Sequence, residues 1–197
     1  MKMTIANQLT MVRIILTPIF FILIIQPQLE LTITASFIFL IASITDWYDG
    51  YIARRFNQVT KWGQFMDPLA DKLLVSSALV VFALLNYVYW WMVIIVIVRD
   101  FLITFLRSFA VYIGKPIVTS AVAKWKTAIQ MTFVFTLLLY MNIPILPEIR
   151  LNLVNNPYIQ WTTISFSIVM VLTAFSGVHY LIMNRSHFTE IKNRYFS

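Results

Sequence analysis

The sequence predicts an all-α protein: an integral membrane bundle of six transmembrane helices with a short N-terminal interfacial helix. Of its 197 residues, 60% are hydrophobic and 12% are charged, and the mean hydropathy is +0.79. A soluble domain is about 45–50% apolar and about a quarter charged, so an ordinary soluble globular protein is excluded. Because a spanning helix needs about 20 apolar residues, the length permits about six spans in one membrane domain over residues 1–197.

Six apolar runs, separated by polar or proline-bearing segments, predict the spans. Ahead of the first run, Asn7, Thr10 and Arg13 recur every three residues before Pro18. This spacing predicts a polar stripe on a short interfacial helix. The apolar runs are residues 14–25, 31–44, 69–85, 91–109, 127–141 and 162–183, and the breaks between them are 26–30, 51–64, 86–89, 112–126 and 142–160.

The positions of Lys and Arg predict the orientation of the bundle. Eleven of them lie near the termini or in the second and fourth connections, whereas the other three connections contain only Arg150. Because cytoplasmic loops carry the excess of Lys and Arg, we expect both termini in the cytoplasm of a multi-pass cell-membrane protein. An outer aromatic belt then contains Tyr87, Tyr89, Trp90 and Trp91. Loops that face anionic lipid explain the net charge of +7, so no nucleic-acid partner is expected.

All five aspartates lie at or inside apolar runs, where a charged side chain costs about 2.5–3.5 kcal/mol. Asp46 and Asp49 are three residues apart at the end of the second span, and Asp67 and Asp71 are four apart at the start of the third. Each pair therefore shares one helix face at the cytoplasmic end, so two helices direct four carboxylates towards one point. Hard oxygen ligands, in a chain without cysteine, favour Mg²⁺ or Mn²⁺.

Ion pairing is the alternative explanation for these aspartates. Four basic residues lie nearby in the sequence and could neutralise them at the surface, namely Arg54, Arg55, Lys61 and Lys72. That explanation suits a single aspartate at a membrane edge, but four at paired helical spacing favour a metal site. Gly50, Ala53 and Gly63 would let a ligand approach the backbone, although close helix packing explains small residues equally well.

Written out, these residues form the pattern DxxDGxxARx8GxxxDxxxD. It resembles the motif of the CDP-alcohol phosphotransferase family at all eight fixed positions, namely Asp46, Asp49, Gly50, Ala53, Arg54, Gly63, Asp67 and Asp71. The resemblance implies a six-helix membrane enzyme that transfers a phosphatidyl or similar group from a CDP-linked donor to an alcohol. It also implies release of CMP, a requirement for divalent metal, and a homodimer.

The resemblance further implies a role for each motif residue. Asp46, Asp49 and Asp67 would hold one metal ion, and Asp46, Asp67 and Asp71 would hold a second. Asp71 is the implied general base, since a nearby carboxylate can accept the proton of the alcohol. The residues implied to border the CDP donor are Gly50, Ala53, Arg54 and Gly63, together with Asn7, Thr10 and Arg13 from a similar NxxTxxR start in family members.

Pro68 leaves two possibilities for the start of the third span. Proline disfavours helical geometry at the preceding residue, so Asp67 either caps the helix or lies inside a helix that begins near Gly63 and kinks.

Basic residues on the fourth and fifth spans predict a pocket for an acceptor that carries phosphate. Arg107, Lys124 and Lys126, with Arg99 alongside, could bind such an anion through charge-assisted hydrogen bonds. Structural ion pairing is the alternative, and Asp100 has no assigned role. The segments RDFLITFLR and KWKTAIQ resemble those of bacterial family members that take CDP-diacylglycerol as donor and sn-glycerol 3-phosphate as acceptor.

The resemblance thus implies an enzyme of a bacterial inner or plasma membrane that works among membrane lipids. A CDP-dependent cardiolipin synthase, which uses phosphatidylglycerol as acceptor, shares the aspartate motif and is the alternative. A cation transporter is a second alternative. Against a transporter, the aspartates lie at the cytoplasmic edge, and no pair of spans interrupted by Gly or Pro suggests inverted repeats.

Overall fold

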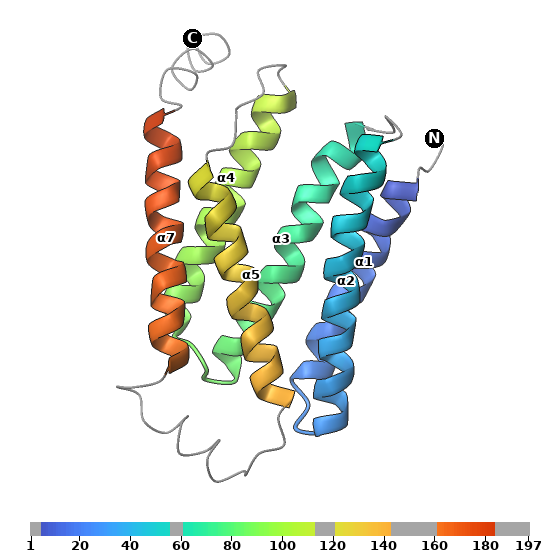
Figure 1. Cartoon of the computed structure of the whole chain (residues 1–197), viewed down its shortest axis with the longest axis vertical. Helices are drawn as coiled ribbons and strands as arrows, with labels where there is room; N and C mark the ends of the chain where they lie inside the picture. Colours follow the sequence, from blue (N-terminus) through green and yellow to red (C-terminus); the bar gives the residue numbers. More distant parts are fainter. Residues whose placement is uncertain (1–4, 56–60, 113–120, 143–160, 184–197) are drawn as a thin grey trace.

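The computed structural model describes residues 5–55, 61–112, 121–142 and 161–183. Within these ranges, only the backbone is described for residues 5–7, 47, 49–55, 61–65, 111–112 and 121–123. In these ranges the chain forms six helices and no strand, which confirms the all-helical fold class. The helices run up and down along one long axis (Figure 1). They are α1 (Ile5–Ile24), α2 (Leu29–Arg55), α3 (Lys61–Leu84), α4 (Trp90–Tyr112), α5 (Ala121–Asn142) and α7 (Trp161–Met183).

Five of these helices extend beyond their predicted apolar runs at the same end of the bundle. This upper end in Figure 1 holds the starts of α1, α3 and α5 and the ends of α2 and α4. Polar side chains do not interrupt the i→i−4 backbone bonds, so a helix continues past its apolar segment. The aspartate motif, divided between the end of α2 and the start of α3, therefore lies on polar helix ends and not in loops.

The N-terminal segment differs from the prediction. Residues 5–24 form the single helix α1, which includes Pro18, so the expected separate interfacial helix is wrong for the described residues. Asn7, Thr10 and Arg13 occupy its first turns, because no helix-breaking residue stands between them and the apolar run. The hydroxyl of Thr17 donates to the carbonyl of Arg13 at 2.8 Å, one turn back.

Helix α3 begins at Lys61, so Pro68 lies inside it. The prediction that Asp67 caps this helix is therefore wrong, and the alternative start near Gly63 is confirmed. As a result, Asp67 and Asp71 lie on consecutive turns of one helix, as their spacing predicts.

The end of α3 reverses the chain through a left-handed residue. Asn86 has φ = 59°, and the amide of Tyr87 donates to the carbonyl of Phe82 at 2.8 Å. This is the bonding pattern of a Schellman motif, in which Asn is tolerated at the left-handed position.

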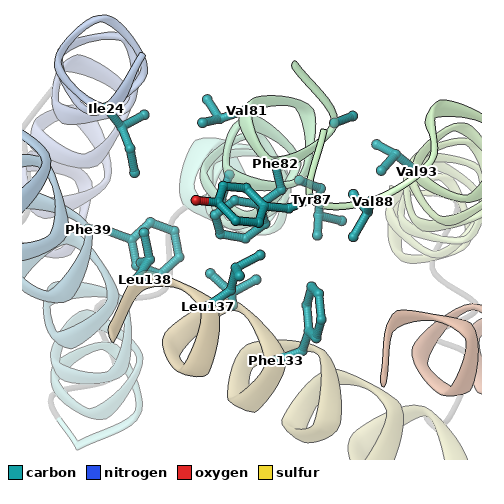
Figure 2. Packing of buried hydrophobic residues seen from close by; sticks show 14 of the residues in the cluster. Ile24, Phe39, Val81, Phe82, Tyr87, Val88, Val93, Phe133, Leu137 and Leu138 are labelled. Atoms are coloured by element: carbon teal, nitrogen blue, oxygen red, sulfur yellow. The ribbon is translucent and has the colours of Figure 1, made fainter. Parts of the chain in front are cut away.

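The apolar core fills the end of the bundle opposite the aspartates. Figure 2 shows Ile24, Phe39, Phe82 and Leu137 pointing towards one another from four helices. The rings of Phe39 and Phe20 lie 5.2 Å apart between α2 and α1. This packing fixes the helices relative to one another, and their polar ends lie above it in Figure 1.

The outer surface of the bundle is apolar. On α7, exposed Ile164, Ile168, Phe175 and Ile182 follow one another at helical spacing along the whole helix. Within the described residues, Leu29–Asp46 of α2 and all of α7 are long and apolar enough to cross a membrane. Exposed apolar side chains on this scale indicate a membrane protein.

Candidate active site at the polar end of the bundle

The motif aspartates lie where α1, α2 and α3 meet. Asp46 is on α2, Asp67 and Asp71 are in the first turns of α3, and α1 begins beside them (Figure 1). Asp49 is one turn beyond Asp46 on α2, and its side chain is outside the described residues. The backbone thus brings both aspartate pairs to one end of the bundle, as the sequence predicts.

Helix α1 holds two of these carboxylates. The hydroxyl of Thr10 donates to Oδ1 of Asp67 at 2.5 Å, and Nη1 of Arg13 lies 2.7 Å from Oδ1 of Asp46. The first turns of α1 therefore contact the motif directly.

Arg13 contacts Asp46 from the protein interior. Its side chain is completely buried, whereas that of Asp46 is 41% exposed. Nε of Arg13 also donates to the carbonyl of Ala42 at 3.3 Å, one turn before Asp46. Because a buried charge needs a partner, Asp46 neutralises Arg13 while its other side stays open to a ligand.

Asp71 has a basic neighbour on its own helix. Nζ of Lys72 lies 2.9 Å from Oδ2 of Asp71, and Lys72 also lies within electrostatic range of Asp46 and Asp100. This contact confirms that Lys72 pairs with a motif aspartate, and it extends the charged region from α3 towards α4.

The chemistry of these side chains fits a hard divalent cation. Among the described side chains, no three acidic, imidazole or thiol groups are gathered closely enough to hold a metal ion. Asp46, Asp67 and Asp71 contact Arg13, Thr10 and Lys72, respectively, and the side chain of Asp49 is not among those described. The fit therefore rests on the type of ligand, because carboxylate oxygens are the ligands that Mg²⁺ and Mn²⁺ prefer.

The other residues expected at the CDP donor fall outside the described side chains. These are Asn7 on α1, Gly50, Ala53 and Arg54 on α2, and Gly63 on α3. Their backbones are helical, so they lie at the same end of the bundle as Asp46 and Asp67.

The basic residues expected to bind the acceptor divide into two pairs. Arg99 and Lys126 both contact Asp100, at 3.0 and 2.5 Å. Arg107 and Lys124 are exposed, and the described part of the chain provides neither with an ion pair. The two groups lie at different depths, since Arg107 is two turns beyond Arg99 on α4.

Sequence reasoning missed the residues of α7 that contact Arg99. Nη2 of Arg99 donates to the hydroxyl of Ser176 at 2.6 Å, and Gly177 leaves room for the Arg99 side chain. Asp100 is a charge inside an apolar run, and that signal indicated that it needs a partner but not which one.

Comparison with known proteins identifies the class. The sequence model of the CDP-alcohol phosphatidyltransferase family matches residues 3–174, which include α1 to α5 and over half of α7. The chain belongs to this family and is a transferase.

Curated relatives match over most of this chain. A Bacillus subtilis protein named CDP-diacylglycerol–glycerol-3-phosphate 3-phosphatidyltransferase is 38% identical over 83% of the chain and 89% of its own length. An Escherichia coli K12 protein of the same name is 34% identical over 94% of the chain and 97% of its own length. A Wigglesworthia protein, again of this name, is 37% identical over 70% of the chain.

Proposed function

We propose that this protein transfers the phosphatidyl group of CDP-diacylglycerol to sn-glycerol 3-phosphate and releases CMP, a step of phospholipid synthesis. The near full-length similarity to relatives named for this reaction supports the two substrates. The observation that carries the proposal is the meeting of α1, α2 and α3, where Arg13 and Thr10 contact motif aspartates Asp46 and Asp67.

The primary hydroxyl of glycerol 3-phosphate attacks the phosphorus attached to diacylglycerol. The new P–O bond forms as the bond to CMP breaks, so CMP leaves with the electron pair. Asp71 accepts the proton of the attacking hydroxyl, or orients that hydroxyl for attack. Lys72, in contact with Asp71, orients this carboxylate.

Asp46, Asp49, Asp67 and Asp71 are the proposed ligands of Mg²⁺ or Mn²⁺, with two ions bound. Such ions neutralise the charge of a diphosphate during in-line displacement. Thr10 and Arg13 hold Asp67 and Asp46 in orientation from the α1 side. Asn7, Gly50, Ala53, Arg54 and Gly63 complete the proposed CDP subsite together with these two.

The acceptor phosphate is bound by basic residues of α4 and α5. Arg107 and Lys124 are exposed and suit the first capture of a dianion from water. Lys126 and Arg99 are the deeper cations of this pocket. A carboxylate-rich and a cation-rich region at one end of the bundle suit a metal-bound diphosphate donor and a phosphorylated acceptor, respectively.

We propose that the protein crosses the membrane six times, with both termini and the active site on the cytoplasmic side. We also propose that it forms a homodimer. Five helices extend past their apolar runs at the active-site end of the bundle, which supports the orientation because the cytoplasmic face carries the Lys and Arg excess. The acyl chains of the donor then lie between lipid-facing helices while its diphosphate reaches the aspartates.

An acceptor screen tests the proposed function. Purified protein in detergent is supplied with radiolabelled CDP-diacylglycerol and, separately, glycerol 3-phosphate, phosphatidylglycerol, inositol or serine. Of these four acceptors, we expect only glycerol 3-phosphate to give CMP release. Release with phosphatidylglycerol would instead establish the cardiolipin synthase alternative, and no release with any acceptor would contradict the assignment.

A further inference from the structure

Two cations converge on a single oxygen of Asp100. Nζ of Lys126 lies 2.5 Å from Oδ1 and 2.6 Å from Oδ2, and Nη1 of Arg99 lies 3.0 Å from the same Oδ1. The side chains of Asp100 and Lys126 are only 3% and 2% exposed. Because like charges repel strongly away from water, the carboxylate between the two cations is what permits their close approach.

Hydrogen-bond donors remain on both cations. An ammonium group has three N–H donors and a guanidinium has five. Asp100 accepts at most two from Lys126. Arg99 donates to Asp100 and Ser176, and its Nε has no acceptor among the described residues. The pair therefore retains capacity for a second anion.

Helix α7 holds Arg99 in this arrangement. A Cβ at Gly177 would lie 3.0 Å from Cγ and 3.2 Å from Nε of Arg99, so a larger residue would require this side chain to shift. Ser176 binds the far end of the guanidinium at 2.6 Å. Asp100 thus joins α4 to α5 through Lys126 and, through Arg99, to α7.

Stability alone explains this arrangement poorly. Replacing a buried ion pair by apolar residues of similar volume is often neutral or stabilising. Arg99 and Lys126 also exceed Asp100 by one positive charge, which leaves the group cationic. Lys72, which contacts the motif residue Asp71, lies within electrostatic range of Asp100, so the group borders the proposed reaction centre.

We infer that Asp100 is a positioning residue for the acceptor: acting through Lys126 and Arg99, it holds both cations where they bind the phosphate of glycerol 3-phosphate. The inference rests on the proposed function and deepens it. It assigns a role to Asp100, the one aspartate outside the motif. In this role Asp100 itself touches no substrate.

The test measures the KM for each substrate and the thermal unfolding midpoint of purified variants in detergent. We expect Asp100→Asn to raise the KM for glycerol 3-phosphate at least about tenfold, the equivalent of one charged hydrogen bond. The KM for CDP-diacylglycerol stays within about twofold, because the donor binds the aspartate motif. Asp100→Glu, which keeps the charge, restores part of the acceptor KM.

A double variant keeps the test decisive where Asp100→Asn fails to fold. Asp100→Leu with Lys126→Met removes both charges, and we expect an unfolding midpoint near that of the parent but a KM for glycerol 3-phosphate still raised about tenfold or more. Glu30→Gln, an exposed carboxylate at the other end of the bundle, is the matched control and changes neither KM.

An acceptor KM that stays at the parent value in the double variant would overturn the inference, as would equal changes in both KM values for Asp100→Asn. These outcomes differ from failure of the proposed function. If the proposed function is wrong, the parent protein itself releases no CMP with glycerol 3-phosphate, and the inference about Asp100 is then wrong as well.

Discussion

The guanidinium of Arg13 lies 2.7 Å from the carboxylate of Asp46, and Arg13 is completely buried while Asp46 is partly open. This contact makes the first helix part of the aspartate centre. It also explains why an arginine stands in the third turn of α1, at the start of its apolar run: its charge is neutralised by α2 and its Nε is satisfied by the Ala42 carbonyl.

Arg13→Lys tests this contact. Lysine keeps the charge, but its single ammonium group cannot reproduce the planar geometry with which arginine reaches both Asp46 and the Ala42 carbonyl. We expect the free energy of unfolding to fall by about 1.5–3 kcal/mol, the value of a hydrogen bond to a charged group. Thermal unfolding in detergent measures this loss. Arg107→Lys, at an exposed arginine, is the stability control, and an equal loss there would contradict the prediction.

Thr10→Val removes the hydroxyl that donates to Asp67 at 2.5 Å and keeps the size of the side chain. We expect the Mg²⁺ concentration for half-maximal CMP release to rise about 10–100-fold, because groups that orient a metal ligand commonly contribute this much. Thr10→Ser retains the hydroxyl and should behave like the parent.

The same variant separates two roles for Thr10. A higher KM for CDP-diacylglycerol at saturating Mg²⁺, with an unchanged Mg²⁺ requirement, would show that Thr10 contacts the donor instead of positioning Asp67.

Metal removal and Asp67→Asn test the aspartate centre. We expect EDTA to abolish CMP release and added Mg²⁺ or Mn²⁺ to restore it, because carboxylate ligands bind these ions reversibly. Asp67→Asn should lose activity by at least about 100-fold with an intact unfolding midpoint. Near-normal turnover of this variant would remove Asp67 from the proposed metal site.

Gly177→Ala should destabilise the protein because of Arg99. The new Cβ would lie 3.0 Å from Cγ of Arg99 and displace the guanidinium from Ser176. In an Arg99→Ala background the obstruction is gone, and alanine in a helix is favoured over glycine by about 0.5–1 kcal/mol. Thermal unfolding should therefore show opposite signs for Gly177→Ala in the two backgrounds; the same sign in both would contradict the contact.

The orientation is testable because the chain contains no cysteine. Single cysteines at Gln28, between α1 and α2, and at Lys124, near the start of α5, lie at opposite ends of the bundle. In intact cells we expect a membrane-impermeant maleimide to label Gln28→Cys and not Lys124→Cys. Labelling of both after lysis is the control, and the reverse pattern in intact cells would invert the proposed orientation.

The extent of the helices shows where sequence patterns stop being informative. The apolar runs predicted the six helices of the described residues, but not that α2 continues to Arg55 or that α3 begins at Lys61. Hydropathy identifies the apolar segment that can lie in lipid, whereas a helix ends where its i→i−4 backbone hydrogen bonds end. For the same reason the separate interfacial helix was wrong, since the polar turns of α1 continue directly into its apolar ones.

Asp100 shows the second limit. Its place in an apolar run indicated that it needs a partner, but four basic residues on α4 and α5 were candidates for other roles. Only the packing of α4 and of α5 against α7 placed Lys126 and Arg99 on one carboxylate oxygen.

The sequence by itself determined the class of protein and predicted the chemistry that we propose for its centre. Spacing along one helix depends on local backbone geometry, so the shared faces of Asp46 with Asp49 and of Asp67 with Asp71 could be derived, and the motif pointed to the family. The tertiary structure alone decided which faces meet. Contacts such as Arg13 with Asp46 and Lys126 with Asp100 join different helices, and their register depends on how the apolar core packs.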